Sequence, residues 1–202
     1  HNFYHYATQA ITEAGLGSAS QIEIGFDPSY QTVQIHFIKI HRGNEVIDRT
    51  NSSGLKLLQE EAERDNGILN GNHTLYANLS DVRKGDIVEH AFSIIGYNKI
   101  YGNYFSYDWQ FGYSVPVGRI KRRLIVEKNV ELSILNKNTD LKPEIKNDKN
   151  VTYTWLINNP SILNAEDNIP AWYMLYPTVQ ISNLKNWKEV KKWNLSLFEI
   201  SK

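Results

Sequence analysis

The run from Ser29 to Asp48 constrains the fold most, because it predicts a β-hairpin to which further strands must pair. Its β-branched and aromatic residues alternate between the two faces of a strand. The pair Gly43-Asn44 then interrupts the run, and this pair accepts a positive φ at low cost, as a hairpin turn requires. Strict alternation places Val33, Ile35 and Phe37 on one face of the first strand and Ile38 and Ile40 on the other.

Short alternating runs separated by turn residues recur along the chain, which is the pattern of an antiparallel β-sandwich. The run Ile87 to Tyr97 is apolar on both faces, which indicates a central strand. We expect a second hairpin over 119–135 and a polar loop over 136–150, which is rich in Lys and Asn. Further strands are predicted at 2–12, 21–26, 55–58, 74–79, 151–157 and 176–181.

These elements predict an all-β fold. We expect one domain over residues 1–185, a largely antiparallel β-sandwich of two sheets, followed by a short C-terminal helix over 186–202. The alternative is two small β domains in tandem, divided within the loop at 136–150.

The C-terminal helix has a clear start signal and one apolar stripe. Asn186 can cap it, and Glu189 stands three residues on, as in a capping box. The stripe is too apolar to remain in water, so we expect it to pack against a neighbour. Its members are Trp187, Val190, Trp193 and Leu197.

Composition excludes several classes of function. Lys plus Arg equals Asp plus Glu, at 22 each, so no net field favours nucleic acid as a partner. No window approaches 18 apolar residues, so we expect no transmembrane segment. The absence of cysteine excludes a disulfide, a thiolate metal site and a cysteine nucleophile within this chain.

The titratable residues show no catalytic pattern. The six histidines lack metal-ligand spacing, and we interpret His36 and His90, which lie in strand patterns, as structural. Asp81, Asp86 and Glu89 could form paired carboxylates, but their place around a glycine turn favours turn and strand-edge chemistry. We therefore predict no catalytic residue, no metal site and no cofactor.

One aromatic segment, residues 101–113, is the candidate binding site. Its rings either stack on sugars, pack on another domain or fill the core of this one. The candidate binding residues are Tyr101, Tyr104, Tyr107 and Trp109.

Seven phrases, in order along nearly the whole chain, resemble those of the DUF3857 family. They are Phe26–Gln31, His41-Arg42 with Val46–Asp48, Leu57–Gln59, Asp81–Asp86, Tyr113–Val117, Ile169–Trp172, and Tyr176–Ser182 continuing to Trp187.

The resemblance implies a context that the residues alone do not give. Domains of this family stand on the N-terminal side of a transglutaminase-like, papain-type domain in exported bacterial proteins, so we expect a periplasmic or cell-surface location. The helix around Trp187 and Trp193 resembles the lead into that domain, and we expect these two residues at an interdomain contact. Any catalytic Cys, His and Asp would then lie downstream of this chain.

The expected function is that of a non-catalytic accessory domain. It would position the downstream domain of the same polypeptide, or bind the protein or glycan that is its partner or substrate. The alternative is a carbohydrate- or cell-wall-binding module that uses segment 101–113. A third class, a hydrolase, would require carboxylates clustered in one cleft.

Overall fold

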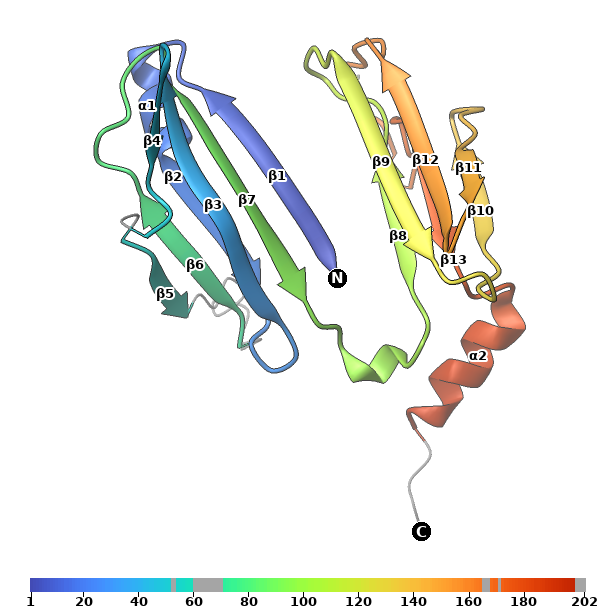
Figure 1. Cartoon of the computed structure of the whole chain (residues 1–202). Helices are drawn as coiled ribbons and strands as arrows, with labels where there is room; N and C mark the ends of the chain where they lie inside the picture. The colour runs from blue at the N-terminus through green and yellow to red at the C-terminus, as the bar shows by residue number, and fades with distance from the viewer. Residues whose placement is uncertain (52–53, 60–70, 165–167, 171, 199–202) are drawn as a thin grey trace. The chain divides into compact units, whose positions relative to one another are not determined.

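The computed structural model describes residues 1–202 except 52–53, 60–70, 165–167, 171 and 199–202 (Figure 1). The chain forms two compact units, His1–Lys99 (unit 1) and Ile100–Lys202 (unit 2). Each unit contains two antiparallel sheets and a core of its own, which confirms the all-β class. The division falls between Lys99 and Ile100, not within 136–150, and the predicted boundary at residue 185 stays a prediction.

Unit 1 is built from a four-stranded and a three-stranded sheet, and the four-stranded one has the order β1-β7-β3-β4. Its strands are β1 (Asn2–Gln9), β7 (Ile87–Ile95), β3 (Thr32–Arg42) and β4 (Glu45–Asp48). The other sheet, in the order β2-β6-β5, consists of β2 (Gln21–Phe26), β6 (His73–Asn78) and β5 (Lys56–Gln59). The short helical turns η1 (Glu13–Gly15) and α1 (Leu16–Ser20) connect β1 to β2.

The predicted first hairpin and the predicted central strand are both confirmed. Strands β3 and β4 are paired, the last pair before the turn being Arg42 opposite Glu45, and Gly43 in the turn has a φ of 57°. Strand β7 lies between β1 and β3 in the sheet.

The prediction of strict alternation along β3 is wrong at one point. A register shift between Ile35 and Phe37 marks a β-bulge, which inserts an extra residue and moves the following side chains to the opposite face. Val33 and Ile35 therefore pack against the same core as Ile38 and Ile40. Phe37 instead contacts the ring of His5 on β1 at the other face of the sheet.

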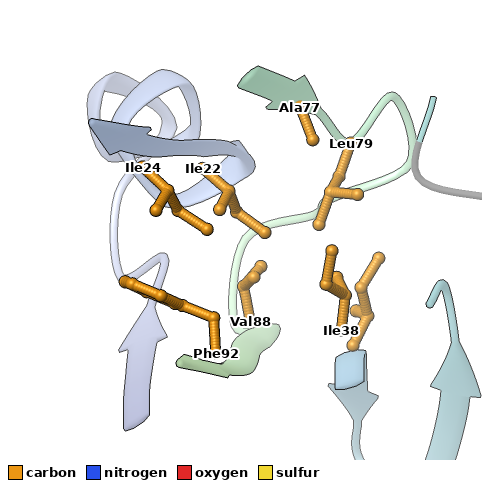
Figure 2. Packing of buried hydrophobic residues seen from close by; sticks show 8 residues of the cluster. Ile22, Ile24, Ile38, Ala77, Leu79, Val88 and Phe92 are labelled. Carbon is orange, nitrogen blue, oxygen red and sulfur yellow. The ribbon is translucent and has the colours of Figure 1, made fainter. Parts of the chain in front are cut away.

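The core of unit 1 lies between its two sheets (Figure 2). Ile22 and Ile24 of β2 face Val88 and Phe92 of β7 across the interior, as the close view shows. Removing this much apolar surface from water is the main favourable term in folding, at roughly 25 cal/mol per Å². The buried cluster consists of Ile22, Ile24, Ile38, Ile40, Ala77, Leu79, Val88 and Phe92.

Unit 2 consists of two three-stranded sheets, with the orders β10-β13-β8 and β11-β12-β9. The first contains β10 (Ser133–Lys137), β13 (Thr178–Ser182) and β8 (Ser106–Gln110). The second contains β11 (Glu144–Asn147), β12 (Val151–Asn158) and β9 (Arg119–Val126). A 3-10 turn, η3 (Lys99–Tyr101), precedes β8, and helix α2 (Trp187–Ser196) follows β13. Their shared core is Phe111, Ile120, Trp155, Val179 and Ile181.

Two local predictions for unit 2 are wrong. Residues 119–135 do not form a hairpin, because β9 pairs with β12 and β10 pairs with β13 in the other sheet. Residues 136–150 are not one loop, because they include the end of β10 and the whole of β11, which pairs with β12. For β9 and β10 the partner strand is distant in sequence, so a local turn signal could not identify it. Strand β11 instead pairs with the next strand along the chain, and its polar composition hid this short hairpin.

Among the described residues, no helix is long and apolar enough to cross a membrane.

Candidate functional site

The four candidate binding residues of the aromatic segment divide into two rings that face inward and two that face outward. On β8, Tyr107 and Trp109 stand opposite Ile181 and Val179, which are fully buried. Directly opposed residues of paired strands point to the same face, so these two rings face the core. Trp109 packs edge-on against Trp155, with 5.4 Å between ring centroids.

The other two candidate residues lie near the surface. Tyr101 and Tyr104 are exposed and form a turn in which the Tyr104 amide donates to the Tyr101 carbonyl at 2.9 Å. The structure therefore does not place the four candidate residues on one platform. The alternative of glycan binding by this segment stays a prediction that rests on Tyr101 and Tyr104.

Helix α2 begins as the sequence predicts. The Asn186 side chain accepts a hydrogen bond from the Glu189 amide at 3.1 Å. The Glu189 carboxylate accepts from the Lys185 amide at 2.8 Å, one residue earlier than the usual capping box. The first bond satisfies an amide of the first turn, and the second fixes the residue before the cap.

The two tryptophans of α2 have different environments. Trp193 is partly buried, stacks on Tyr101 with 5.7 Å between centroids, and donates its indole N–H to the Ile100 carbonyl at 3.0 Å. Trp187 is 84% exposed, and Phe198, just beyond the helix, is also exposed. None of the described residues of α2 is fully buried. The helix is thus fixed through Trp193, while Trp187 presents a large apolar surface to solvent.

The outer face of the four-stranded sheet in unit 1 carries a polar cluster that sequence analysis missed. The Glu89 carboxylate, on central β7, accepts hydrogen bonds from the Nε2–H groups of His5 at 2.8 Å and His41 at 2.6 Å. His41 and then His5 contribute most to lowering the pKa of the Glu89 carboxyl. These residues come from three different strands, and only the register of β1, β7 and β3 brings them together.

A second polar group lies on the same sheet. The Ser93 hydroxyl is 2.9 Å from Nε2 of His1 and 2.8 Å from Nε2 of His36. His36 is thus hydrogen-bonded within the sheet, as its structural interpretation requires. In the part of the chain that the structure describes, no group of His, Asp or Glu residues is arranged to hold a metal ion.

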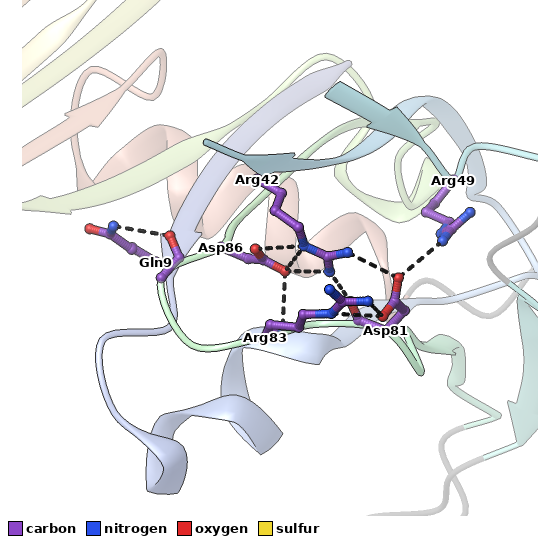
Figure 3. Close-up of polar contacts among 7 residues, drawn as sticks. Gln9, Arg42, Arg49, Asp81, Arg83 and Asp86 are labelled. Carbon is purple, nitrogen blue, oxygen red and sulfur yellow. Dashed lines mark hydrogen bonds and ion pairs between the residues drawn. The ribbon is translucent and has the colours of Figure 1, made fainter. Parts of the chain in front are cut away.

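Asp81 and Asp86 form an ion-pair network with Arg42 at the turn before β7 (Figure 3). The Arg42 guanidinium donates to both carboxylate oxygens of Asp86, at 2.8 to 3.2 Å, and also to Asp81. The Asp86 side chain is only 4% exposed and accepts a further bond from the Arg83 amide at 2.9 Å. Arg42 is the main cause that lowers the pKa of both carboxyls. The network neutralises buried charge and fixes the turn, which confirms the prediction of turn chemistry for Asp81 and Asp86.

The open hollows in the described parts of the chain include the following two. One, of about 400 Å³, lies in unit 1 beside the Asp27 turn and His73. The other, of about 480 Å³, lies in unit 2 between Ile134 of β10 and Ile145 of β11. Neither contains a pair of carboxylates, which glycoside hydrolysis requires.

Comparison with known proteins identifies the family. The model of DUF3857, a domain of unknown function, matches residues 1–162. The chain belongs to the DUF3857 family. The match ends before α2, so the resemblance seen in the phrases at Ile169–Trp172 and Tyr176–Trp187 lies outside the matched range.

One solved structure shows that this fold occurs within a longer polypeptide. It is the crystal structure of a "putative protease" from Parabacteroides distasonis, with a TM-score of 0.73 and 16% sequence identity. The similarity covers 93% of this chain and 38% of the Parabacteroides chain, so this DUF3857 chain spans under two fifths of that protein. At this identity the similarity establishes a shared fold. A comparison with curated proteins gives no match.

Proposed function

We propose that this DUF3857 chain is a non-catalytic accessory domain of an exported bacterial transglutaminase-like protein. It positions the domain that follows α2 in the same polypeptide, or binds that domain's partner or substrate. The observation that carries the proposal is the exposure of Trp187 on a helix that is otherwise held in place by Trp193.

Helix α2 is suited to an interdomain contact because it combines a fixed and a free apolar residue. Trp193 sets the position of the helix on unit 2 through its stack on Tyr101 and its hydrogen bond. Trp187 then offers an indole ring, which is the kind of side chain that dominates protein interfaces. The similar fold within a Parabacteroides chain that is more than twice as long supports a context with further domains.

The absence of catalysis is supported by how the titratable residues are used. Arg42 neutralises Asp86 and contacts Asp81, and His5 and His41 are both bonded to Glu89. None of these groups lines either hollow. Protease and transamidase assays on residues 1–202 should therefore show no turnover, and turnover that one point mutation abolishes would contradict this part of the proposal.

The interdomain role is tested by a polypeptide that continues through the next domain. Trp187→Ala should lower the stability of that longer protein and raise hydrogen exchange in α2, but leave residues 1–202 alone unchanged within roughly 0.5 kcal/mol. Trp172→Ala is the matched control, because Trp172 is equally exposed, at 84%, but lies outside α2. Equal effects of the two variants in the longer protein would refute the contact.

The exported location needs a test of its own. We expect fractionation of the native cell to recover the protein from the periplasm or the cell surface. Recovery from the cytosol would overturn this part of the proposal and leave the interdomain contact untouched.

A further inference from the structure

The outer face of the sheet β11-β12-β9 in unit 2 carries a row of cations. On β9, Arg119, Lys121 and Arg123 alternate with residues that face the core, and all three are exposed. Alternate residues of a strand lie roughly 7 Å apart on one face, so these charges form one line. Within the described part of the chain, none of the three forms an ion pair. Lys146 and Glu144 of β11, on the same face, pair with each other and add no net charge.

Two exposed aliphatic side chains lie among these cations. Leu156 of β12 stands directly opposite Lys121, and Ile125 follows Arg123 at the next outward position of β9. Directly opposed residues share a face, so Leu156, 46% exposed, and Ile125, 51% exposed, belong to the cationic surface. The chain as a whole has no net charge, but the sheet register gathers positive charge and apolar area on this one face.

We propose that this surface, the β9 face, binds an anionic lipid surface. It consists of Arg119, Lys121, Arg123, Ile125 and Leu156. A bilayer interface uses both kinds of side chain, because its anionic headgroups attract Lys and Arg while aliphatic groups enter the boundary with the acyl chains.

Other anionic occupants would use only part of the β9 face. A soluble polyanion is held by the cations alone, and the two aliphatic groups would add nothing to its binding. An acidic strand added to the edge of β9 would stand opposite residues of β9, but Leu156 lies one strand further into the sheet. The lipid surface is therefore the occupant that the composition of the face favours.

Cosedimentation with vesicles tests the electrostatic half of the proposal. Vesicles of phosphatidylcholine with about one third phosphatidylglycerol should bind residues 1–202 and release them as the salt concentration rises. Lys121→Gln and Arg123→Gln should each weaken binding about fivefold, which corresponds to about 1 kcal/mol for a cation near an anionic surface. The matched control is Lys56→Gln, on the exposed strand β5 of unit 1, which should leave binding unchanged. Absence of binding, or equal losses in the three variants, overturns the proposal.

A second comparison separates a lipid surface from other anions. Leu156→Ser should weaken vesicle binding at least about threefold, because it removes apolar area from the interface, but should not change the affinity for soluble polyphosphate. Circular dichroism checks that the variant is folded. An unaffected affinity of Leu156→Ser for vesicles overturns the proposal. Wild-type binding to polyphosphate or to an oligoglutamate peptide as tight as binding to vesicles identifies a different occupant and also overturns it.

The proposal does not depend on the interdomain contact at α2, because the β9 face contains no residue of that helix. A polypeptide that continues through the next domain should show the same loss of vesicle binding when Lys121 and Arg123 are both replaced by Gln. Vesicle binding of the longer protein that is indifferent to these two changes overturns the proposal and leaves the interdomain contact untouched.

Discussion

Replacing Trp193 by alanine tests how firmly α2 is attached to unit 2. The ring is partly buried, so the change should cost less than the 3–5 kcal/mol typical of a large aromatic removed from a core. The stack on Tyr101 contributes about 0.5–1.5 kcal/mol and the hydrogen bond to the Ile100 carbonyl a further net 0.5–1.5 kcal/mol. We therefore expect Trp193→Ala to lower the free energy of unfolding by about 2 kcal/mol.

Urea denaturation followed by far-UV circular dichroism measures this change, and two variants calibrate it. Trp193→Phe keeps the stacked ring but removes the indole donor, so it should cost about 1 kcal/mol. Trp187→Ala, on the same helix, removes an exposed ring and should stay within roughly 0.5 kcal/mol of the wild type. If Trp193→Ala is as silent as Trp187→Ala, the contacts with Tyr101 and Ile100 do not hold the helix, and the reasoning fails.

Three further predictions concern unit 1. Arg42→Met should lower the urea midpoint because it leaves the nearly buried Asp86 carboxylate without its cation, and an unchanged midpoint would show that the pair is not stabilising. Arg42 lowers the folded-state pKa of Asp86, so the stability that this carboxyl contributes is complete above its ordinary pKa of 3.8 and is lost as the pH falls through the lower folded-state pKa. Urea midpoints measured at a series of pH values below about 4 should therefore fall less steeply with pH in Asp86→Asn than in the wild type. Gly96→Ala should lower the free energy of unfolding by roughly 2 kcal/mol, because the added Cβ would lie 1.9 Å from the Tyr30 carbonyl oxygen and the residue has a φ of 114°. Gly17→Ala is the control, because the space around Gly17 is open, and equal urea midpoints for the two variants would contradict the tight approach at Gly96.

The fold class followed from local signals whose physical causes are short-range. Alternation places apolar side chains on one face, Gly43 permits the turn between β3 and β4, and the Asn186 side chain satisfies the Glu189 amide in the first turn of α2. Each of these effects acts within a few residues, so the sequence alone was sufficient to predict it. The same holds for the acidic turn before β7, where Asp81 and Asp86 were assigned to structure.

The candidate sites depended on information that is not local. Whether Trp109 binds a ligand or fills the core was open in the sequence, and the pairing of β8 with β13 decided it by setting the ring against buried Val179. Likewise Trp187 and Trp193 share one helical stripe, but only Trp193 meets Tyr101 and the Ile100 carbonyl.

Sheet register decided what no local pattern could show. A single extra residue at the β3 bulge moved Phe37 away from the core face that Ile35 occupies. Pairing between strands more than 40 residues apart brought His5, His41 and Glu89 together. Pairing with β12 and with β13 placed β9 and β10 in different sheets. Which strands pair, and in which register, depends on which faces of the sheets become buried together in the assembled units. This is a cooperative property, so only the tertiary structure determines it.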